Sequence, residues 1–254
     1  MKVKIFFLLI VFLCSAFPLF SQSAEELIAQ GDDLYNEMKD MATAKEALAK
    51  YMEALNILIK HNNENKYDAY WRIARVHYYI GAHTERKKDK KTIFAQGIYY
   101  GTKAAEAEQE KPDGHYWLGV NNGVYGEAKG VLKSLSLVKP IKRDMNKVIE
   151  LDRTYEDGGA DRVLGRVYFK LPGFAGGSKD KSLEHLLKSK ELGPEDALTR
   201  VYLAETLLKH KKIDEAREEL EYVLNMEDDP RWVLGIRESK EMARELLKDK
   251  KFRK

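Results

Sequence analysis

The stretch PEDALTRVYLAETLLKHKKIDEAREELEYVLN, residues 194–225, decides the fold class of this chain of 254 residues. In its second part the apolar side chains recur three and four positions apart, as on one face of a helix: Ile213, Ala216, Leu220, Val223 and Leu224. Asp214 and Glu215 stand near the start of this segment, where acidic side chains suit the positive end of the helix dipole. The stretch therefore predicts a pair of helices joined by a turn.

The helix pair matches the tetratricopeptide repeat, a unit of 34 residues in which large and small side chains alternate so that neighbouring helices nest. If Pro194 takes position 32 of one repeat, the small-residue positions 8 and 20 of the next fall on Ala204 and Ala216. Positions 11 and 24, which require large residues, then fall on Leu207 and Leu220. The register therefore predicts a complete repeat after Pro194.

Degenerate copies of the repeat extend upstream. Gly165 and Leu186 fit positions 8 and 24 of one copy, and Gly31 and Tyr51 fit the same positions near the N-terminus. A second unit spans the polar segment ERKKDKK, residues 85–91, which we expect to be a loop. In the third unit the helix 115–126 is followed by a stretch to Leu151 that holds Pro140 and that we expect to be irregular.

A helix from Pro230 to about Lys250 is expected to close the array, because proline suits the first helical turn and a terminal repeat needs a polar outer face. We therefore predict an all-α fold. Four to five tetratricopeptide-like helix-turn-helix repeats form one superhelical domain, residues 24–254, which ends in a C-terminal capping helix.

The N-terminus has the layout of a cleaved signal peptide, residues 1–23: Lys2 and Lys4, an apolar run from Ile5 to Phe20, and small residues at 21–23. The run is shorter than the roughly 20 residues that a membrane span requires, and Pro18 interrupts it. No later segment is long and apolar enough to span a membrane. We expect an exported protein.

Cys14 raises the alternative of a lipid anchor. A lipoprotein signal peptide is cut directly before a cysteine that follows a small residue, whereas Leu13 precedes Cys14 here. We therefore interpret Cys14 as part of the apolar run, and cleavage leaves the mature chain without a cysteine. Disulfides, thiol nucleophiles and cysteine-based metal sites are then excluded.

Charge and motif content argue against several other functions. Without Lys2 and Lys4 the chain keeps 42 of its 44 basic residues against 41 acidic ones, interleaved rather than arranged in the basic stripe of a nucleic-acid site. The six histidines show no metal-binding spacing, and no catalytic triad or acid–base pair stands out. We expect no metal, no cofactor and no catalysis. A hydrolase or transferase with an unrecognised site is the alternative that stays open.

Three segments resemble the TatT family, the tetratricopeptide components associated with TRAP-type solute transporters: YWLGVN at 116–121, GGADRVLGRVYFKLPGFAGGSKDKSLEHLLKS at 158–189 and VYLAETLL at 201–208. The resemblance covers most of the mature chain and is most specific at 158–178. It implies a periplasmic homotrimer whose repeats surround a cleft or narrow channel. It also implies a periplasmic solute-binding protein as partner and an apolar or organic-acid ligand. The family often carries a lipid anchor, and this chain departs from it at Cys14.

One candidate binding region is the helix HYWLGVNNGVYG. Its candidate residues are Tyr116, Trp117, Asn121, Asn122 and Tyr125. Trp117, Asn121 and Tyr125 share one helix face; the rings could equally be packing residues between helices. The amides favour a cleft wall, because a buried amide without partners costs about 1–3 kcal/mol. The hypothesis predicts that leucine at 121 and 122 weakens ligand binding without unfolding the protein.

The second candidate region is the segment LPGFAGGSK, residues 171–179, an insertion between the two helices of one repeat. Its candidate residues are Pro172, Gly173, Phe174, Gly176 and Gly177. The order Gly-Ser-Lys is not the Gly-Lys-Ser/Thr of a phosphate-binding loop. Insertions in repeat proteins often lie on the binding face. The alternative is a loop that is only structural, in which the glycines permit positive φ.

These expectations combine into a periplasmic tetratricopeptide binding protein, an accessory component that contacts a TRAP-transporter solute-binding protein and its ligand. The alternative is an envelope scaffold that binds another envelope protein and no small molecule.

Overall fold

The computed structural model describes residues 22–63, 65–228 and 233–253, and within these ranges all regular structure is helical. The predicted all-α fold is therefore confirmed. Almost all of the predicted signal peptide, and Pro230 at the predicted start of the capping helix, lie outside the described residues. The helices are α1 (Ala24–Asn36), α2 (Met41–Lys60), α3 (Tyr67–Ala82), α4 (Lys87–Ala107), α5 (Pro112–Lys129), η1 (Val131–Ser134), α6 (Leu135–Asp152), α7 (Tyr155–Lys170), η2 (Gly173–Ala175), α8 (Lys179–Leu192), α9 (Ala197–Lys209), α10 (Ile213–Asn225), α11 (Val233–Leu247) and η3 (Lys250–Arg253).

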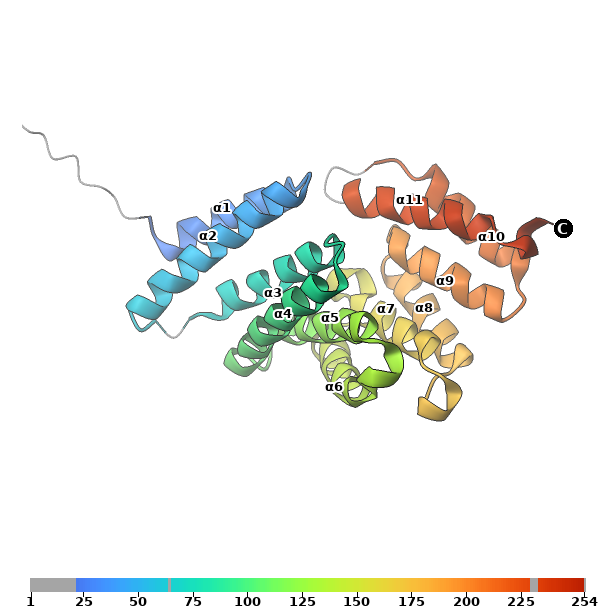
Figure 1. Cartoon of the computed structure of the whole chain (residues 1–254), viewed down its shortest axis with the longest axis horizontal. Coiled ribbons are helices and arrows are strands. Elements are labelled where there is room, and N and C mark those ends of the chain that lie inside the picture. Colours follow the sequence, from blue (N-terminus) through green and yellow to red (C-terminus); the bar gives the residue numbers. More distant parts are fainter. Residues whose placement is uncertain (1–21, 64, 229–232, 254) are drawn as a thin grey trace, which may run out of the picture.

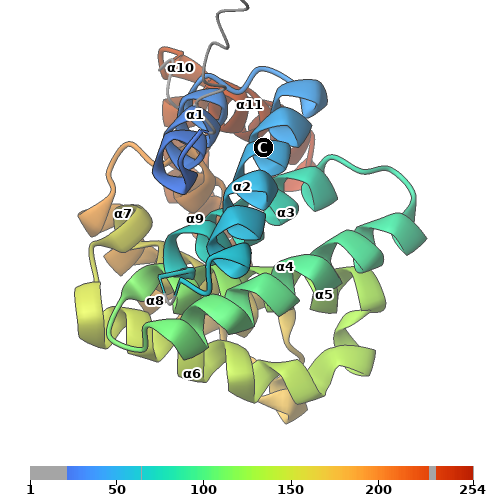
Figure 2. The ribbon, with the colours of Figure 1, turned by 90° about the vertical axis from the view of Figure 1, so that its left-hand side faces the viewer.

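Consecutive helices pack against each other along the whole described chain, as in a tetratricopeptide superhelix. The array bends into an arc, so that α1 and α2 at one end approach α10 and α11 at the other (Figure 1). The view turned by 90° places α1 near α10 and α11 at one side of the molecule and α6 at the opposite side (Figure 2). None of the helices in the described ranges is long and apolar enough to cross a membrane.

The predicted register of small and large residues recurs in successive helix pairs. A Cβ added at Gly31 of α1 would lie 2.4 Å from the Tyr51 ring of α2. The same clash would arise at the glycine of three later pairs, at 2.3 to 2.6 Å: Gly81 with Phe94, Gly119 with Met145, and Gly165 with Leu186. In the pair α9–α10, Ala204 and Leu220 are both fully buried. Each pair thus nests a large side chain of its second helix over a small residue of its first.

Two local predictions were wrong. Most of the ERKKDKK segment is helical, because α4 already begins at Lys87. The lysines at the start of this helix are exposed, which is why their polarity suggested a loop. The stretch around Pro140 is also helical: it lies inside α6, which continues through the proline. Ile141, Met145 and Val148 of α6 are buried in the central core, and their packing outweighs the single hydrogen bond that proline removes.

Each end of the array is closed by a feature that the sequence explains. Ser23 accepts a hydrogen bond from the Glu26 backbone and the Glu26 side chain accepts one from the Ser23 backbone, which forms a capping box at the start of α1. At the other end α11 packs on α9 and α10, with Ala243 buried, in the capping position that the sequence predicts.

Candidate functional site

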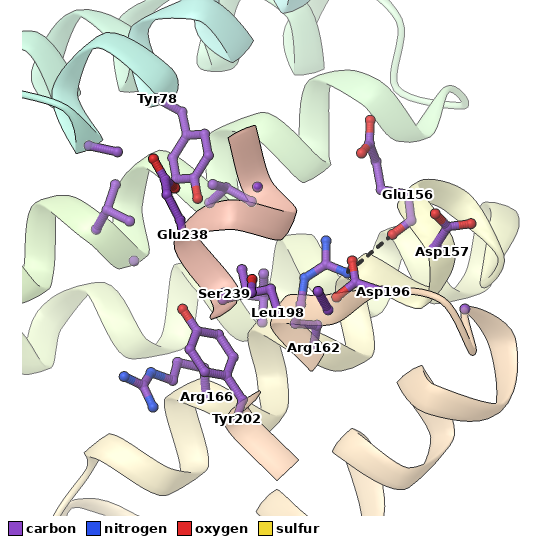
Figure 3. A pocket seen from close by; sticks show the side chains of 18 of the residues that line it. Tyr78, Glu156, Asp157, Arg162, Arg166, Asp196, Leu198, Tyr202, Glu238 and Ser239 are labelled. Carbon is purple, nitrogen blue, oxygen red and sulfur yellow. Dashed lines mark hydrogen bonds and ion pairs between the residues drawn. The ribbon is translucent and has the colours of Figure 1, made fainter. Parts of the chain in front are cut away.

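A large cavity lies inside the arc of the described helices, with a volume of about 1240 Å³. Every α-helix except α2 and α4 contributes to its wall, so residues from both ends of the chain face the same space. Figure 3 shows Tyr78 of α3, Arg162 of α7, Tyr202 of α9 and Glu238 of α11 around it. Seven aromatic side chains line the described wall: Tyr35, Tyr78, Tyr79, Tyr116, Trp117, Tyr202 and Tyr222. The cavity is thus aromatic and formed by the curvature of the whole array.

A contact between the two arms of the arc lies in the cavity wall. His83 Nε2, at the C-terminal end of α3, bonds Glu238 Oε1 of α11. The hydrogen bond from Glu238 raises the pKa of His83 above its usual value, although burial and the charge of Lys90 oppose this change. The ion pair therefore holds the ends of the array together when His83 is protonated.

Arg162 connects several elements of the cavity wall through its side chain. Its guanidinium donates to Asp196 Oδ2 at 2.9 Å and to the Tyr116 hydroxyl at 3.0 Å. Asp196 is held in turn, because its other oxygen caps α9 at the Thr199 backbone N–H. Burial lowers the pKa of Arg162, but the charges of Asp196 and Glu156 and the phenols of Tyr116 and Tyr78 outweigh burial and raise it. Arg162 is therefore charged, and it joins α5, α7 and α9.

The turn that begins α7 presents a carboxylate to the cavity. Glu156, Asp157 and Gly158 all have left-handed backbone angles, with φ of 52°, 55° and 71°. For the two non-glycine residues this conformation costs about 1 kcal/mol each, so neighbouring structure must impose it. Gly193 supplies part of that constraint, since a Cβ there would lie 2.5 Å from the Asp157 Cβ. The strained turn fixes Glu156 in the cavity wall.

Glu156 has no hydrogen-bond or ion-pair partner for its carboxylate among the described residues, and burial raises its pKa above the usual value. Only its backbone oxygen is engaged, by Arg162. Figure 3 shows the side chain directed away from the Arg162–Asp196 pair. Strained backbone that carries an unpaired charge is typical of a residue kept for a ligand rather than for stability.

The residues predicted on helix 115–126 divide between two environments. Tyr116 and Trp117 line the cavity and are both buried. Asn121 lies outside the cavity wall and is fully buried between α3, α4 and α5. Its Nδ2 donates to the Ala74 oxygen at 3.0 Å and to the Trp117 oxygen at 2.8 Å. Sequence reasoning placed this amide on a cleft wall, but the backbone of α3 provides the partner that makes burial acceptable.

Asn122 and Tyr125 do not line the cavity either. Asn122 is buried, and Tyr125 borders a small surface recess beside the first turns of α4. These two residues therefore do not lie beside Tyr116 and Trp117 in the cavity. In the next turns of α5 the residues that face the cavity are Val120, Gly123 and Val124.

The insertion 171–179 meets the cavity only at its first residue, Leu171. Pro172, Gly173, Gly176 and Gly177 lie outside the wall, and Phe174 is 84% exposed. Gly176 has a φ of 86°, and a Cβ at Gly177 would lie 1.9 Å from the Leu171 carbonyl oxygen. Gly176 and Gly177 are therefore required by the shape of the loop. A binding role for the loop, including exposed Phe174, stays a prediction.

Sequence reasoning missed Glu156, Arg162 and Asp196 as site residues. The available signal was the Glu-Asp-Gly-Gly sequence at 156–159, since an Asp-Gly pair favours left-handed backbone. The described residues contain no group of three His, Asp, Glu or Cys side chains close enough to hold a metal ion.

The nested helix pairs and their curved array define a tetratricopeptide-like repeat protein. The sequence model of the family described as "Regulator of microtubule dynamics protein 1-3" matches residues 27–171, more than half of the chain. The chain belongs to this family. No curated protein matches it. The narrower resemblance to TatT proteins is not confirmed by this match.

Solved structures support the fold. The chain is similar to TTC0263, a thermophilic TPR protein of Thermus thermophilus, with a TM-score of 0.63 and 17% identity. That similarity covers 87% of this chain and 98% of the other. Yeast Tom70 matches with a TM-score of 0.32 and 13% identity over 91% of this chain and 66% of its own. At these identities the first likeness concerns the fold alone, and the second is too weak to support a conclusion.

Proposed function

We propose that this protein is an exported interaction module that holds a segment of a protein partner in its central cavity. The observation that carries the proposal is the cavity itself, about 1240 Å³ and lined from both ends of the array. Small-molecule sites usually measure about 300–1,000 Å³, so this space suits several residues of a chain. Tetratricopeptide-like arrays are extended surfaces shaped for such contacts.

The aromatic wall favours binding over catalysis. Large planar rings lose little conformational entropy on binding and contribute much contact area, which is why they dominate interfaces. The polar groups that the wall does contain are mostly engaged with each other, as in the Arg162–Asp196 pair. No nucleophile–base pair faces the space among the described lining residues.

The location and the partner form the finer part of the proposal. The signal-peptide layout of residues 1–23 supports export to the periplasm. The TatT-like segments favour a TRAP-transporter solute-binding protein as partner, with an envelope scaffold as the alternative. The family's description names microtubule dynamics. We carry over only the repeat fold, since an exported chain does not meet cytosolic microtubules.

A variant that fills the cavity tests the proposal. Gly123 of α5 lines the cavity, and a Cβ there would meet no atom within 4 Å. Gly123→Trp therefore begins its side chain in open space and should direct a large ring into the cavity. Tyr99, 54% exposed on α4 outside the cavity, provides the control Tyr99→Trp.

Crosslinking with mass spectrometry in the native envelope should yield the same partner for the wild type and for Tyr99→Trp, with crosslinks to cavity residues. The Gly123→Trp protein should lose that partner while keeping its circular dichroism spectrum. If the partner persists in folded Gly123→Trp, it binds elsewhere and the cavity is not the binding site.

A further inference from the structure

The cavity wall carries an unusual excess of negative charge. Among its described residues three side chains are Lys or Arg: Arg162, Arg166 and Lys170. Seven are carboxylates: Glu127, Glu156, Asp157, Glu195, Asp196, Glu227 and Glu238. With His83 neutral the described wall has a net charge of −4, whereas the whole chain carries +3. The acidic character therefore belongs to the cavity and not to the chain as a whole.

The two arginines of the wall are already neutralised. Arg162 pairs with Asp196 at 2.9 Å. Arg166 pairs with Glu205 of α9 and stacks on the Tyr202 ring, its Cζ 4.1 Å from the ring centre. Lys170 is exposed at the end of α7. An anionic ligand that binds Arg162 or Arg166 would have to displace an internal carboxylate, which makes an organic acid a poor fit to this part of the cavity.

Glu156 differs from these paired arginines. Its side chain is partly buried in the wall, and no described side chain forms an ion pair or a hydrogen bond with its carboxylate. A buried charge without a partner costs free energy that a bound cation would recover. Burial raises the pKa of Glu156 although the charges of Arg162 and Arg75 oppose this change, and a further positive charge placed beside the carboxylate would lower the pKa again.

The aromatic wall suits the same kind of ligand. A guanidinium or ammonium group is attracted to the face of a tyrosine or tryptophan ring. The protein already uses its lining rings in this way: Arg75 lies 3.7 Å from the Tyr35 ring centre and Arg200 lies 3.4 Å from that of Tyr222. The Tyr78 and Trp117 rings, 5.9 Å apart, line the same cavity.

We propose that the cavity binds a cationic segment of the protein partner, whose lysine or arginine side chain pairs with Glu156. This inference rests on the proposed function and adds the chemistry of the segment. The occupant is a stretch of chain rather than a free polyamine, because the volume of about 1240 Å³ exceeds that of ordinary small-molecule sites.

Binding of designed peptides tests the charge preference. The probes are fluorescent peptides of equal length that differ only in carrying lysine, glutamine or glutamate at the same positions. Fluorescence polarisation gives the affinity for the wild type, for Glu156→Gln and for Glu218→Gln. Glu218 is exposed on α10 outside the cavity, so its variant changes the net charge equally. Glu156→Gly is the second cavity variant, because glycine adopts the φ of 52° without strain.

The lysine peptide should bind more tightly than the other two, and added salt should weaken it. Both Glu156 variants should bind it about tenfold more weakly, as expected for the loss of one partly buried charge pair, and Glu218→Gln should match the wild type. Equal or tighter binding of the glutamine or glutamate peptide would overturn the inference. So would unchanged affinity in the Glu156 variants.

Two further outcomes separate this inference from the proposed function. If the glutamate peptide binds and Gly123→Trp abolishes that binding, the cavity holds a segment but not a cationic one. If spermine binds with the same dependence on Glu156 while the lysine peptide does not bind, the ligand is a small amine. That result would overturn the inference that the cavity holds a segment of a protein.

Discussion

His83 and Glu238 form an ion pair between α3 and α11 although 155 positions separate them in the chain. The pair joins the two arms of the arc and both residues line the cavity. The connection between the two arms therefore depends on the protonation of one histidine.

This pair predicts a pH-dependent stability. The folded pKa of His83 is raised, so the pair contributes fully below the unfolded value of about 6.5 and its contribution is lost as pH rises through the folded pKa. The contribution of the pair to the free energy of unfolding should stay below about 1 kcal/mol, because the Glu238 side chain is 53% exposed and water screens the pair.

Urea unfolding of the wild type and of Glu238→Gln at about pH 5.5 and about pH 8 measures this contribution. The wild type should be the more stable protein at the lower pH, and the difference should shrink at the higher pH. A difference that grows with pH would rule out the proposed role of His83.

Asn121 should stabilise the fold rather than bind a ligand. Asn121→Leu removes the hydrogen bond to Ala74 and brings a branched side chain against Gly97, where a Cβ would already lie 2.1 Å from the Asn121 Oδ1. We expect a loss of about 2 kcal/mol in the free energy of unfolding. Asn56→Leu, on the exposed face of α2, is the matched control and should change it by less than about 0.5 kcal/mol. An Asn121→Leu protein of normal stability with weakened partner binding would restore the ligand hypothesis.

Two glycines in helix interiors should respond oppositely to alanine. A Cβ at Gly101 of α4 would lie 2.8 Å from the Leu118 Cα of α5, so Gly101→Ala should separate these helices and cost about 1–3 kcal/mol. Gly123 faces open space, so Gly123→Ala should stabilise the protein by about 0.5–1 kcal/mol. Thermal unfolding compares the two, and destabilisation by both would show that the cavity side of α5 is more tightly packed than described.

The left-handed turn predicts a conflict between stability and binding. Glu156→Gly removes the strain at a φ of 52° and should raise the free energy of unfolding by about 1 kcal/mol, while it abolishes the charge that binds the partner. Lys211→Gly relieves similar strain at a φ of 63° outside the cavity and should stabilise without affecting binding. Denaturation and peptide-binding assays on both variants check this prediction. If both variants lose binding, the loss comes from the change in backbone rigidity and not from the missing charge of Glu156.

The fold was predictable because the repeat register depends on neighbours in the same helix pair. Gly31 with Tyr51 and Gly165 with Leu186 are contacts between consecutive helices, and their spacing is visible in the sequence. The helix around Pro140 was not predictable in this way, because the buried side chains of α6 and not local propensity keep it helical.

The site was predictable only in part. Tyr116 and Trp117 follow from the aromatic content of one helix, and both lie in the cavity. Glu156, Arg162 and Asp196 converge with α11 because of the curvature of the whole array, which no single repeat encodes. Asn121 was assigned to a cleft because its hydrogen-bond partner Ala74 lies 47 positions away.

The most direct test of the central claim is photo-crosslinking from inside the cavity. A photoreactive amino acid at Leu198, which lines the cavity on α9, is compared with one at exposed Tyr99 of α4. The account predicts that Leu198 captures one reproducible segment of a partner, rich in lysine or arginine, and that Tyr99 does not. Capture of that segment from Tyr99 but not from Leu198 would contradict it.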